Sequence, residues 1–193
     1  MRKCLVMIFM LVASVTAIAQ PRPHNVDKAH SQINFVAEAR FLSAKGFFDK
    51  WEAEVLLDPA KPETSSFKIT IDAASINTRV QQRDNHLRSA DFFDVAKFPQ
   101  ITMVSKKITR VADGKFTVTV DLTIHGVTKQ MDVPLTQVFY ENNRGRYRSN
   151  FEINRREFGI VYNSRLNPIE DTVKVEVDIN VQIPPPPKPA TSN

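Results

Sequence analysis

One short segment carries the residues best suited to acid–base chemistry. In the sequence RDNHL, Arg83, Asp84 and His86 lie within four positions of one another. A histidine beside a carboxylate can act as a general base. No serine or cysteine nucleophile motif accompanies these residues, so roles in capping and pairing are preferred over catalysis. We predict no catalytic residue and keep an enzyme that uses His86 and Asp84 as an alternative.

Other polar residues could bind an anion or a metal ion. Arg155 and Arg156 could meet a pyrophosphate, although an arginine at a strand end more often pairs with an acid or faces water. His30, His86 and His125 lack the i, i+3 or i, i+4 spacing of a typical metal-binding pair, so only convergence in space would make a site. The sequence therefore predicts no metal and no cofactor.

The composition favours a single domain that does not bind nucleic acid. A chain of 193 residues can bury one substantial core and is too short for two domains to be expected. Its formal net charge is +5, or +3 without Arg2 and Lys3, and its basic residues are scattered. Nucleic-acid-binding proteins gather such residues into a stripe.

The first residues follow the pattern of a secretory signal peptide. A basic pair precedes an apolar run over residues 4–13, and the sequence AIA at 17–19 fits a cleavage site. The apolar run is short for a membrane core of about 30 Å, so no integral membrane segment is expected after cleavage. We predict a signal peptide over residues 1–19 and a periplasmic or secreted protein. The mature chain would contain no cysteine, hence no disulfide bond.

Most of the chain from residue 31 to 183 alternates apolar and polar residues, as strands with one buried face do. In residues 172–183, six aliphatic side chains alternate with polar ones, and a register shift of one residue would expose all six. The same pattern places Phe35, Phe47 and Trp51 on the inward face of the first strands. It also predicts strands over residues 31–41, 47–59, 67–73 and 115–125.

Turn sequences separate these strands and predict antiparallel hairpins: Ala44-Lys45-Gly46, Asp58-Pro59, Asp113-Gly114, His125-Gly126 and Asn142-Asn143-Arg144-Gly145. Long antiparallel strands with one buried face most naturally close into a barrel. An outer-membrane barrel would gather its aromatic residues into girdles at the strand ends, and these are spread instead. We predict an all-β fold, a single antiparallel barrel over residues 20–183. The proline-rich run 184–193 cannot pair in a sheet and is predicted to be a disordered tail.

One stretch interrupts the alternation. Thr78 is a candidate N-cap, with Gln81 three residues later, and we predict a short helical insertion over about residues 78–96. Leu87, Phe92 and Phe93 on this insertion must bury themselves, either as a plug over one mouth of the barrel or as a gate that lines a cavity entrance.

Several motifs, in this order and spacing, resemble the YceI-like family. They are His30-Ser31, Gly46-Phe47-Phe48, SINT at 75–78, RDNHLRSADFFD at 83–94, FPQI at 98–101, LTIHGVTK at 122–129 and NRREFG at 154–159. The resemblance covers about residues 27–183. It implies a lipocalin-like barrel, periplasmic or secreted, whose elongated interior holds a long isoprenoid or similar lipid. Met103 stands where the family often has an aromatic residue, which affects the shape of the pocket.

The family resemblance and the alternation of apolar and polar residues together predict a binding protein rather than an enzyme. Its partner would be a long-chain isoprenoid or fatty lipid, and any protein partner is unknown. A module with a filled barrel that binds another protein is a further alternative. The residues expected to contact the lipid are Phe35, Phe47, Trp51, Ile71, Leu87, Phe92, Phe93, Met103, Val120, Phe151, Ile153 and Phe158. Those expected to have structural roles are His30, Arg83, Asp84, His86 and Arg155.

Overall fold

The computed structural model describes residues 20–183, so the predicted signal peptide and proline-rich tail lie outside the described residues. The strands are β1 (Arg22–Val26), β2 (Gln32–Ala39), β3 (Leu42–Phe48), β4 (Trp51–Leu57), β5 (Ser66–Asp72), β6 (Ile76–Asn77), β7 (Gln100–Ala112), β8 (Lys115–Ile124), β9 (Val127–Glu141), β10 (Arg144–Asn154) and β11 (Ile169–Gln182). The helix α1 spans Gln81–Arg88. Short 3-10 turns are η1 (Lys28–His30), η2 (Pro62–Thr64), η3 (Ala73–Ser75) and η4 (Arg155–Phe158).

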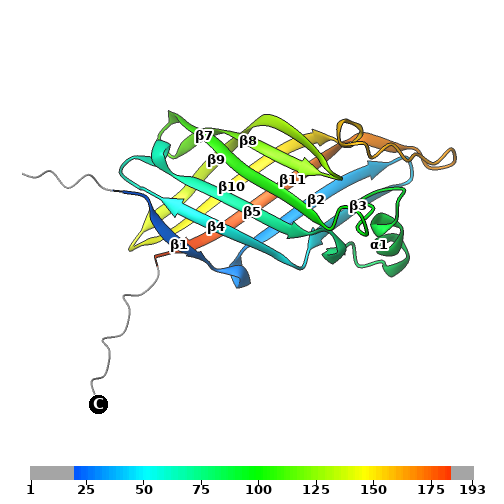
Figure 1. The fold of residues 1–193 in the computed structure, drawn as a ribbon, viewed down its shortest axis with the longest axis horizontal. Coiled ribbons are helices and arrows are strands. Elements are labelled where there is room, and N and C mark those ends of the chain that lie inside the picture. The colour runs from blue at the N-terminus through cyan, green and yellow to red at the C-terminus, as the bar shows by residue number, and fades with distance from the viewer. Residues whose placement is uncertain (1–19, 184–193) are drawn as a thin grey trace, which may run out of the picture.

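Within residues 20–183, eight strands form a closed antiparallel ring in the order β1-β4-β5-β7-β8-β9-β10-β11. The short strand β1 closes it, because His24 pairs with Val55 of β4 while Val26 pairs with Val181 of β11. Figure 1 shows the resulting elongated barrel from the side, with α1 at one end. The predicted all-β, lipocalin-like barrel with a helical insertion is confirmed.

The strand β11 pairs with β1 near its end and with β2 near its beginning. After η1 the chain continues as β2, which pairs with the first part of β11, and β3 then pairs with β2 and with the short β6. Since β3 and β4 share no ladder, a polar groove opens between them, lined by residues of β2, β3 and β4 and by Arg79 and Arg83.

Apolar side chains at alternate positions along the strands fill the interior of the barrel. In β8 every second side chain is buried: Phe116, Val118, Val120, Leu122 and Ile124. These residues belong to one contiguous apolar cluster that also contains Ile69, Ile71, Met103 and Val177 from other strands. Burial of apolar surface on one face of each strand is therefore the main source of stability.

Four of the five predicted turns join paired antiparallel strands: Asp58-Pro59, Asp113-Gly114 with φ of 62° at Gly114, His125-Gly126 and Asn142-Asn143. His125 and Gly126 between β8 and β9 both have positive φ, at 51° and 75°, and Asn142 and Asn143 between β9 and β10 have 49° and 63°. Consecutive positive φ values match the twist of a two-residue hairpin. In the second of them, Arg144 and Gly145 already belong to β10.

The predicted turn at Ala44-Lys45-Gly46 is wrong. These residues lie inside β3, and the chain reverses earlier, at Arg40 and Phe41. Gly46 faces inward there, directly opposite Phe35 of β2. A Cβ atom at Gly46 would lie 2.7 Å from Cε1 of Phe35, so this glycine makes room for a ring rather than for a turn.

Candidate functional site

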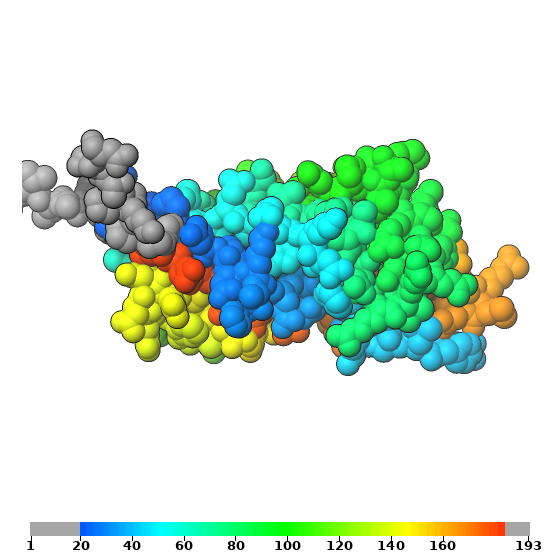
Figure 2. All heavy atoms as spheres, turned by 90° about the horizontal axis from the view of Figure 1, so that it is seen from below, coloured from blue at the N-terminus to red at the C-terminus, as the bar shows by residue number. Residues whose placement is uncertain are grey.

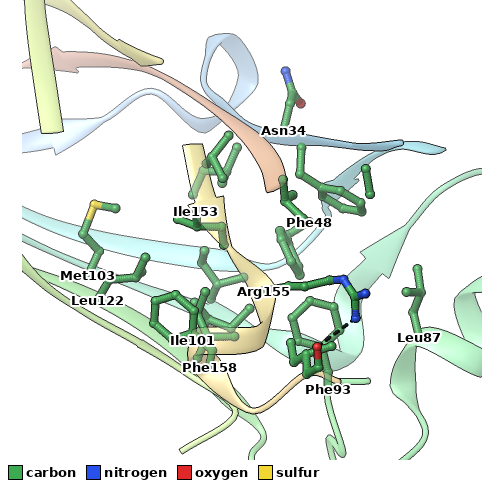
Figure 3. A pocket seen from close by; sticks show the side chains of 18 of the residues that line it. Asn34, Phe48, Leu87, Phe93, Ile101, Met103, Leu122, Ile153, Arg155 and Phe158 are labelled. Carbon is green, nitrogen blue, oxygen red and sulfur yellow. Dashed lines mark hydrogen bonds between the residues drawn. The ribbon is translucent and has the colours of Figure 1, made fainter. Parts of the chain in front are cut away.

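An apolar cavity of about 140 Å³ lies inside the barrel at the end covered by the insertion. Side chains from seven strands, from η4 and from the insertion line it, and among its lining residues only Asn34 and Arg155 are polar. Figure 3 shows Ile101 and Met103 of β7 and Leu122 of β8 on one side, with Leu87 and Phe93 of the insertion at the end. The site can exclude water and make dispersion contacts.

A second apolar cavity, of about 70 Å³, continues the first toward the other end of the barrel. Ile69, Met103 and Val177 line both cavities and so form the partition between them. The second cavity ends near Tyr147, whose hydroxyl lies 3.4 Å from Oε1 of Gln137. Burial raises the pKa of Tyr147 above its usual range, so this phenol is neutral.

Most of the predicted lipid contacts face the larger cavity. Nine of the twelve line it: Phe35, Ile71, Leu87, Phe92, Phe93, Met103, Phe151, Ile153 and Phe158. Val120 is fully buried on the same inward face but lines neither cavity. Phe47 and Trp51 line the polar groove instead.

The prediction that Phe47 points inward is wrong. The strand β3 buries Ala44, Gly46 and Phe48, so Phe48 faces the cavity and Phe47 faces the groove. The sequence from Phe47 to Leu57 looks like one strand, but Asp49 and Lys50 separate β3 from β4 and reset the alternation. Trp51 has the expected inward orientation, because it pairs directly with Ile71.

The groove and the larger cavity share part of their wall. Ile33, Phe35 and Phe48 line both, together with Asn34. Phe48 packs against Phe35, with ring centroids 5.8 Å apart, and against Phe93 of the insertion at 6.2 Å. Phe35 and Phe48 therefore separate the apolar interior from the polar groove at the gap between β3 and β4, and Phe93 supports Phe48 from the cavity side.

A buried hydrogen-bond network holds the start of the insertion. Oδ1 of Asp84 accepts from the backbone N–H of Thr78 at 2.8 Å and from its hydroxyl at 2.5 Å. Arg83 donates from Nε to Oγ1 of Thr78 at 2.8 Å and from Nη2 to its carbonyl oxygen at 3.0 Å. The prediction of Thr78 as the N-cap is wrong, because the helix begins at Gln81 and Asp84 reaches back to Thr78.

His86 does not pair with Asp84. Its Nε2 lies 2.8 Å from Oδ2 of Asp91, and its ring meets Phe92 and Tyr162 edge-on, with both centroid distances 5.0 Å. Phe92 and Tyr162 also touch each other at 5.0 Å. The arrangement joins the insertion to the segment that follows η4. Tyr162 could not be predicted from the sequence, since no local pattern links it to a histidine 76 positions earlier.

Arg155 is buried and all of its donors are used. Nη1 donates to the carbonyl oxygens of Ile160 and Tyr162, and Nη2 donates to Oδ1 of Asp171 at 2.9 Å. The carbonyl oxygens of Ile169 and Glu170 accept its two other N–H groups. Burial lowers the pKa of this guanidinium, and Asp171 opposes that shift. Arg155 therefore organises the chain between η4 and β11, and no donor remains for a pyrophosphate.

Arg88 and Gly126 also fix the insertion. Arg88 donates to the carbonyl oxygens of Ala74 and Ile76, both at 2.7 Å. Gly126 meets the ring of Phe98, which also packs on His125 at 4.5 Å. Both ends of the insertion are thus attached to the barrel.

The predicted histidines lie in separate local environments. Nδ1 of His30 lies 2.8 Å from Oδ2 of Asp27, whereas His86 contacts Asp91 and His125 contacts Phe98. Among residues 20–183 no cluster of three or more His, Cys, Asp or Glu side chains could hold a metal ion. Over the same residues, no helix has the length and apolar character needed to cross a membrane.

Comparison with known proteins places this architecture in a family. The family described as YceI-like domain matches residues 24–181. A UPF0312 protein of Pseudomonas savastanoi pv. phaseolicola is 32% identical over 158 residues, which cover 78% of this chain and 81% of that protein.

Solved structures agree with this assignment. Burkholderia cenocepacia BcnA superposes with a TM-score of 0.76 at 28% identity, covering 81% of this chain and 99% of that one. The Campylobacter jejuni YCEI protein gives 0.71 at 28% identity, covering 76% and 88%. A polyisoprenoid binding domain from Saccharophagus degradans gives 0.66 at 19% identity, covering 86% and 100%, and at that identity it shows a shared fold.

Proposed function

This chain belongs to the YceI-like family, and on that premise we propose that it binds a long apolar chain, a polyisoprenoid or a similar lipid, inside its barrel. The observation that carries the proposal is the pair of apolar cavities that follow one another along the barrel, separated only by Ile69, Met103 and Val177. The Saccharophagus degradans domain, named as polyisoprenoid binding, shares this fold.

The chemistry of the interior suits a ligand recognised by its length. Each buried methylene contributes about 0.8 kcal/mol, so ten buried carbons gain about 8 kcal/mol before ordering costs are subtracted. The polar lining residue Arg155 already uses every donor within the protein. Binding needs no cofactor and no charged anchor.

The proposal describes a carrier or a store rather than an enzyme. Asp84 and His86, the residues of the enzyme alternative, bind Thr78 and Asp91 respectively and do not contact each other as a catalytic pair would. We place the protein in the periplasm or outside the cell, on the strength of the signal-peptide pattern in residues 1–19.

Native mass spectrometry of the purified protein, followed by organic extraction and analysis of the extract, tests the proposal. A long-chain apolar lipid should be released in near-stoichiometric amount. Ile153→Trp, which places a larger side chain in the cavity, should reduce the amount of lipid while the circular dichroism spectrum stays that of a folded barrel. Protein that contains no lipid and takes up no added polyprenol would contradict the proposal and favour the filled-barrel interaction module.

A further inference from the structure

Two loops form a projecting tip at the same end of the barrel as the insertion. The first is the reversal between β2 and β3 at Arg40 and Phe41, and the second is the segment 159–168 before β11. The backbone N–H of Phe41 donates to Oδ1 of Asn167, and that of Arg40 donates to the carbonyl oxygen of Pro168, both at 3.0 Å. In Figure 2 the second loop, coloured orange, extends past the rest of the molecule.

The tip exposes large apolar side chains. Leu166 is 83% exposed and Phe41 is 71% exposed, with Val161 and Leu42 also exposed beside them. Isolated exposed apolar residues are ordinary, but several on two connected, projecting loops mark an interaction surface.

The two loops of the tip carry basic residues, and acidic residues flank them on β2 (Glu38) and β11 (Glu170 and Asp171), the last two lining a shallow pocket with Arg40. Residues 39–48 contain Arg40 and Lys45 and no acidic residue, and residues 158–169 contain Arg165 and no acidic residue. The guanidinium of Arg40 lies over the ring of Phe41, 5.1 Å from its centroid. The tip therefore combines apolar side chains with positive charge, which is the combination that binds an anionic membrane surface.

The opposite end of the barrel lacks this combination. It exposes Val111 near the β7–β8 turn and Phe139 near the β9–β10 turn. The turns there carry acidic residues, Asp113 and Glu141, alongside basic ones. Exposed apolar residues alone thus do not distinguish the two ends. The loops of the tip differ from the turns at the opposite end because they carry basic residues and no acidic residue of their own.

The tip adjoins the apolar cavity. Ile169 lines the cavity and pairs with Ala39 of β2, the residue that directly precedes Arg40. A lipid surface bound by the tip would therefore lie next to the end of the cavity that Leu87 and Phe93 also line.

We propose that Phe41 and Leu166, with Arg40 and Arg165, dock the protein on an anionic lipid bilayer, the source or destination of the apolar chain. The role of docking in lipid transfer rests on the proposed function, whereas the docking itself is argued from the exposed residues of the tip. The apolar side chains enter the boundary between head groups and acyl chains, while the arginines meet the anionic head groups.

Flotation with vesicles tests this docking. The wild-type protein should bind vesicles of equal parts phosphatidylglycerol and phosphatidylethanolamine, and bind phosphatidylcholine vesicles much more weakly. Phe41→Ser with Leu166→Ser should lower the partition coefficient by about tenfold or more, because the apolar groups that enter the bilayer are lost. The matched control, Val111→Ser with Phe139→Ser at the opposite end, should bind as wild type does.

A second pair of variants tests the charge. Arg40→Gln with Arg165→Gln should weaken binding to the anionic vesicles, and high salt should remove most of the difference from wild type. Wild type that binds no vesicles, tip variants that bind like wild type, or equal losses in the tip and control variants would each overturn the proposal. The proposal would also be overturned if the tip substitutions changed only the oligomeric state, or only the binding of another protein, and left vesicle binding unchanged.

Lipid extraction from the same samples separates this inference from the proposed function. Protein that retains a long-chain lipid yet binds no vesicles overturns membrane docking and leaves the carrier intact. Protein that binds vesicles through the tip but never contains or accepts a lipid supports docking and overturns the carrier.

Discussion

Phe35 of β2 lies across Gly46 of β3, and its ring occupies the space where a side chain at Gly46 would begin. Thr78 limits the same space, since its Cγ2 would lie 2.9 Å from a Cβ atom at Gly46. The phenyl ring can therefore line the cavity only because its neighbour has no side chain.

Gly46→Ala should push the ring of Phe35 away from β3 and lower the free energy of unfolding by about 1–3 kcal/mol through overpacking. Urea unfolding measures this effect. Adding Phe35→Leu, a smaller side chain, should restore part of the lost stability. If the two substitutions had strictly additive effects, the close approach of the ring would not be the cause.

Met103→Ala should join the two cavities into one longer space. The expected cost is about 2–5 kcal/mol of stability, and lipids extracted from the variant should include longer chains than those from wild type. The control is Ile101→Ala, which removes a buried side chain that lines only the larger cavity. The same shift in chain length for both variants would show that Met103 is not part of a partition.

Phe92→Ala with Phe93→Ala distinguishes a gate from a plug. A gate should lose less than the cavity cost of about 3–5 kcal/mol per aromatic ring in the lipid-free protein, while the lipid dissociates faster. Stopped-flow release of a fluorescent lipid measures the rate. Phe98→Ala is the control, because Phe98 directly follows the insertion but packs on His125 instead of lining the cavity. An unchanged rate with a large loss of stability would identify a plug.

His86→Ala should lower stability by about 1–3 kcal/mol and loosen lipid retention, because contacts with Asp91, Phe92 and Tyr162 are lost. His30→Ala, at an exposed histidine that contacts Asp27, should have a smaller effect. Mass spectrometry of bound lipids before and after incubation provides the second readout. A product made by wild type but not by folded His86→Ala would revive the enzyme alternative.

Asp178 should make stability depend on pH in the acid range. Hydrogen bonds from Arg146, at 2.8 and 2.6 Å, and from Arg148 lower the pKa of this buried carboxyl. Because the pKa is lower in the folded state, the stabilisation is full above the unfolded value of about 3.9 and is lost as pH falls through the folded value.

Asp178→Asn should therefore cost about 1–3 kcal/mol at neutral pH and flatten the acid limb of the stability curve. Denaturant unfolding at a series of pH values measures both. Asp113→Asn, at a fully exposed side chain, is the matched control and should leave the curve unchanged. If the stability of Asp178→Asn still fell at acid pH as that of the wild type does, other carboxyl groups would be responsible for the pH dependence.

The barrel could be predicted from the sequence because alternation of apolar and polar residues is a local pattern. The family could be predicted because its motifs occur in a fixed order and spacing. Alternation in β8 and β11 determines which side chains face inward once any strand forms, and the motifs from RDNHL to LTIHGVTK keep their spacing along the chain. Most of the predicted lipid contacts follow from that alternation, as Phe151 and Ile153 on β10 illustrate.

The tertiary structure alone decided which residues meet across the barrel. Phe47 and Phe48 are adjacent and chemically identical, and the break between β3 and β4 selects the one that faces inward. Asp84 binds Thr78 instead of His86, and Arg155 takes its acceptors from the loop that follows it and from the start of β11. Met103 becomes a partition only because β5 and β11 bring Ile69 and Val177 to its level. Such contacts depend on ring closure and on segments far apart in the chain, whereas alternation reports only the face on which each side chain lies.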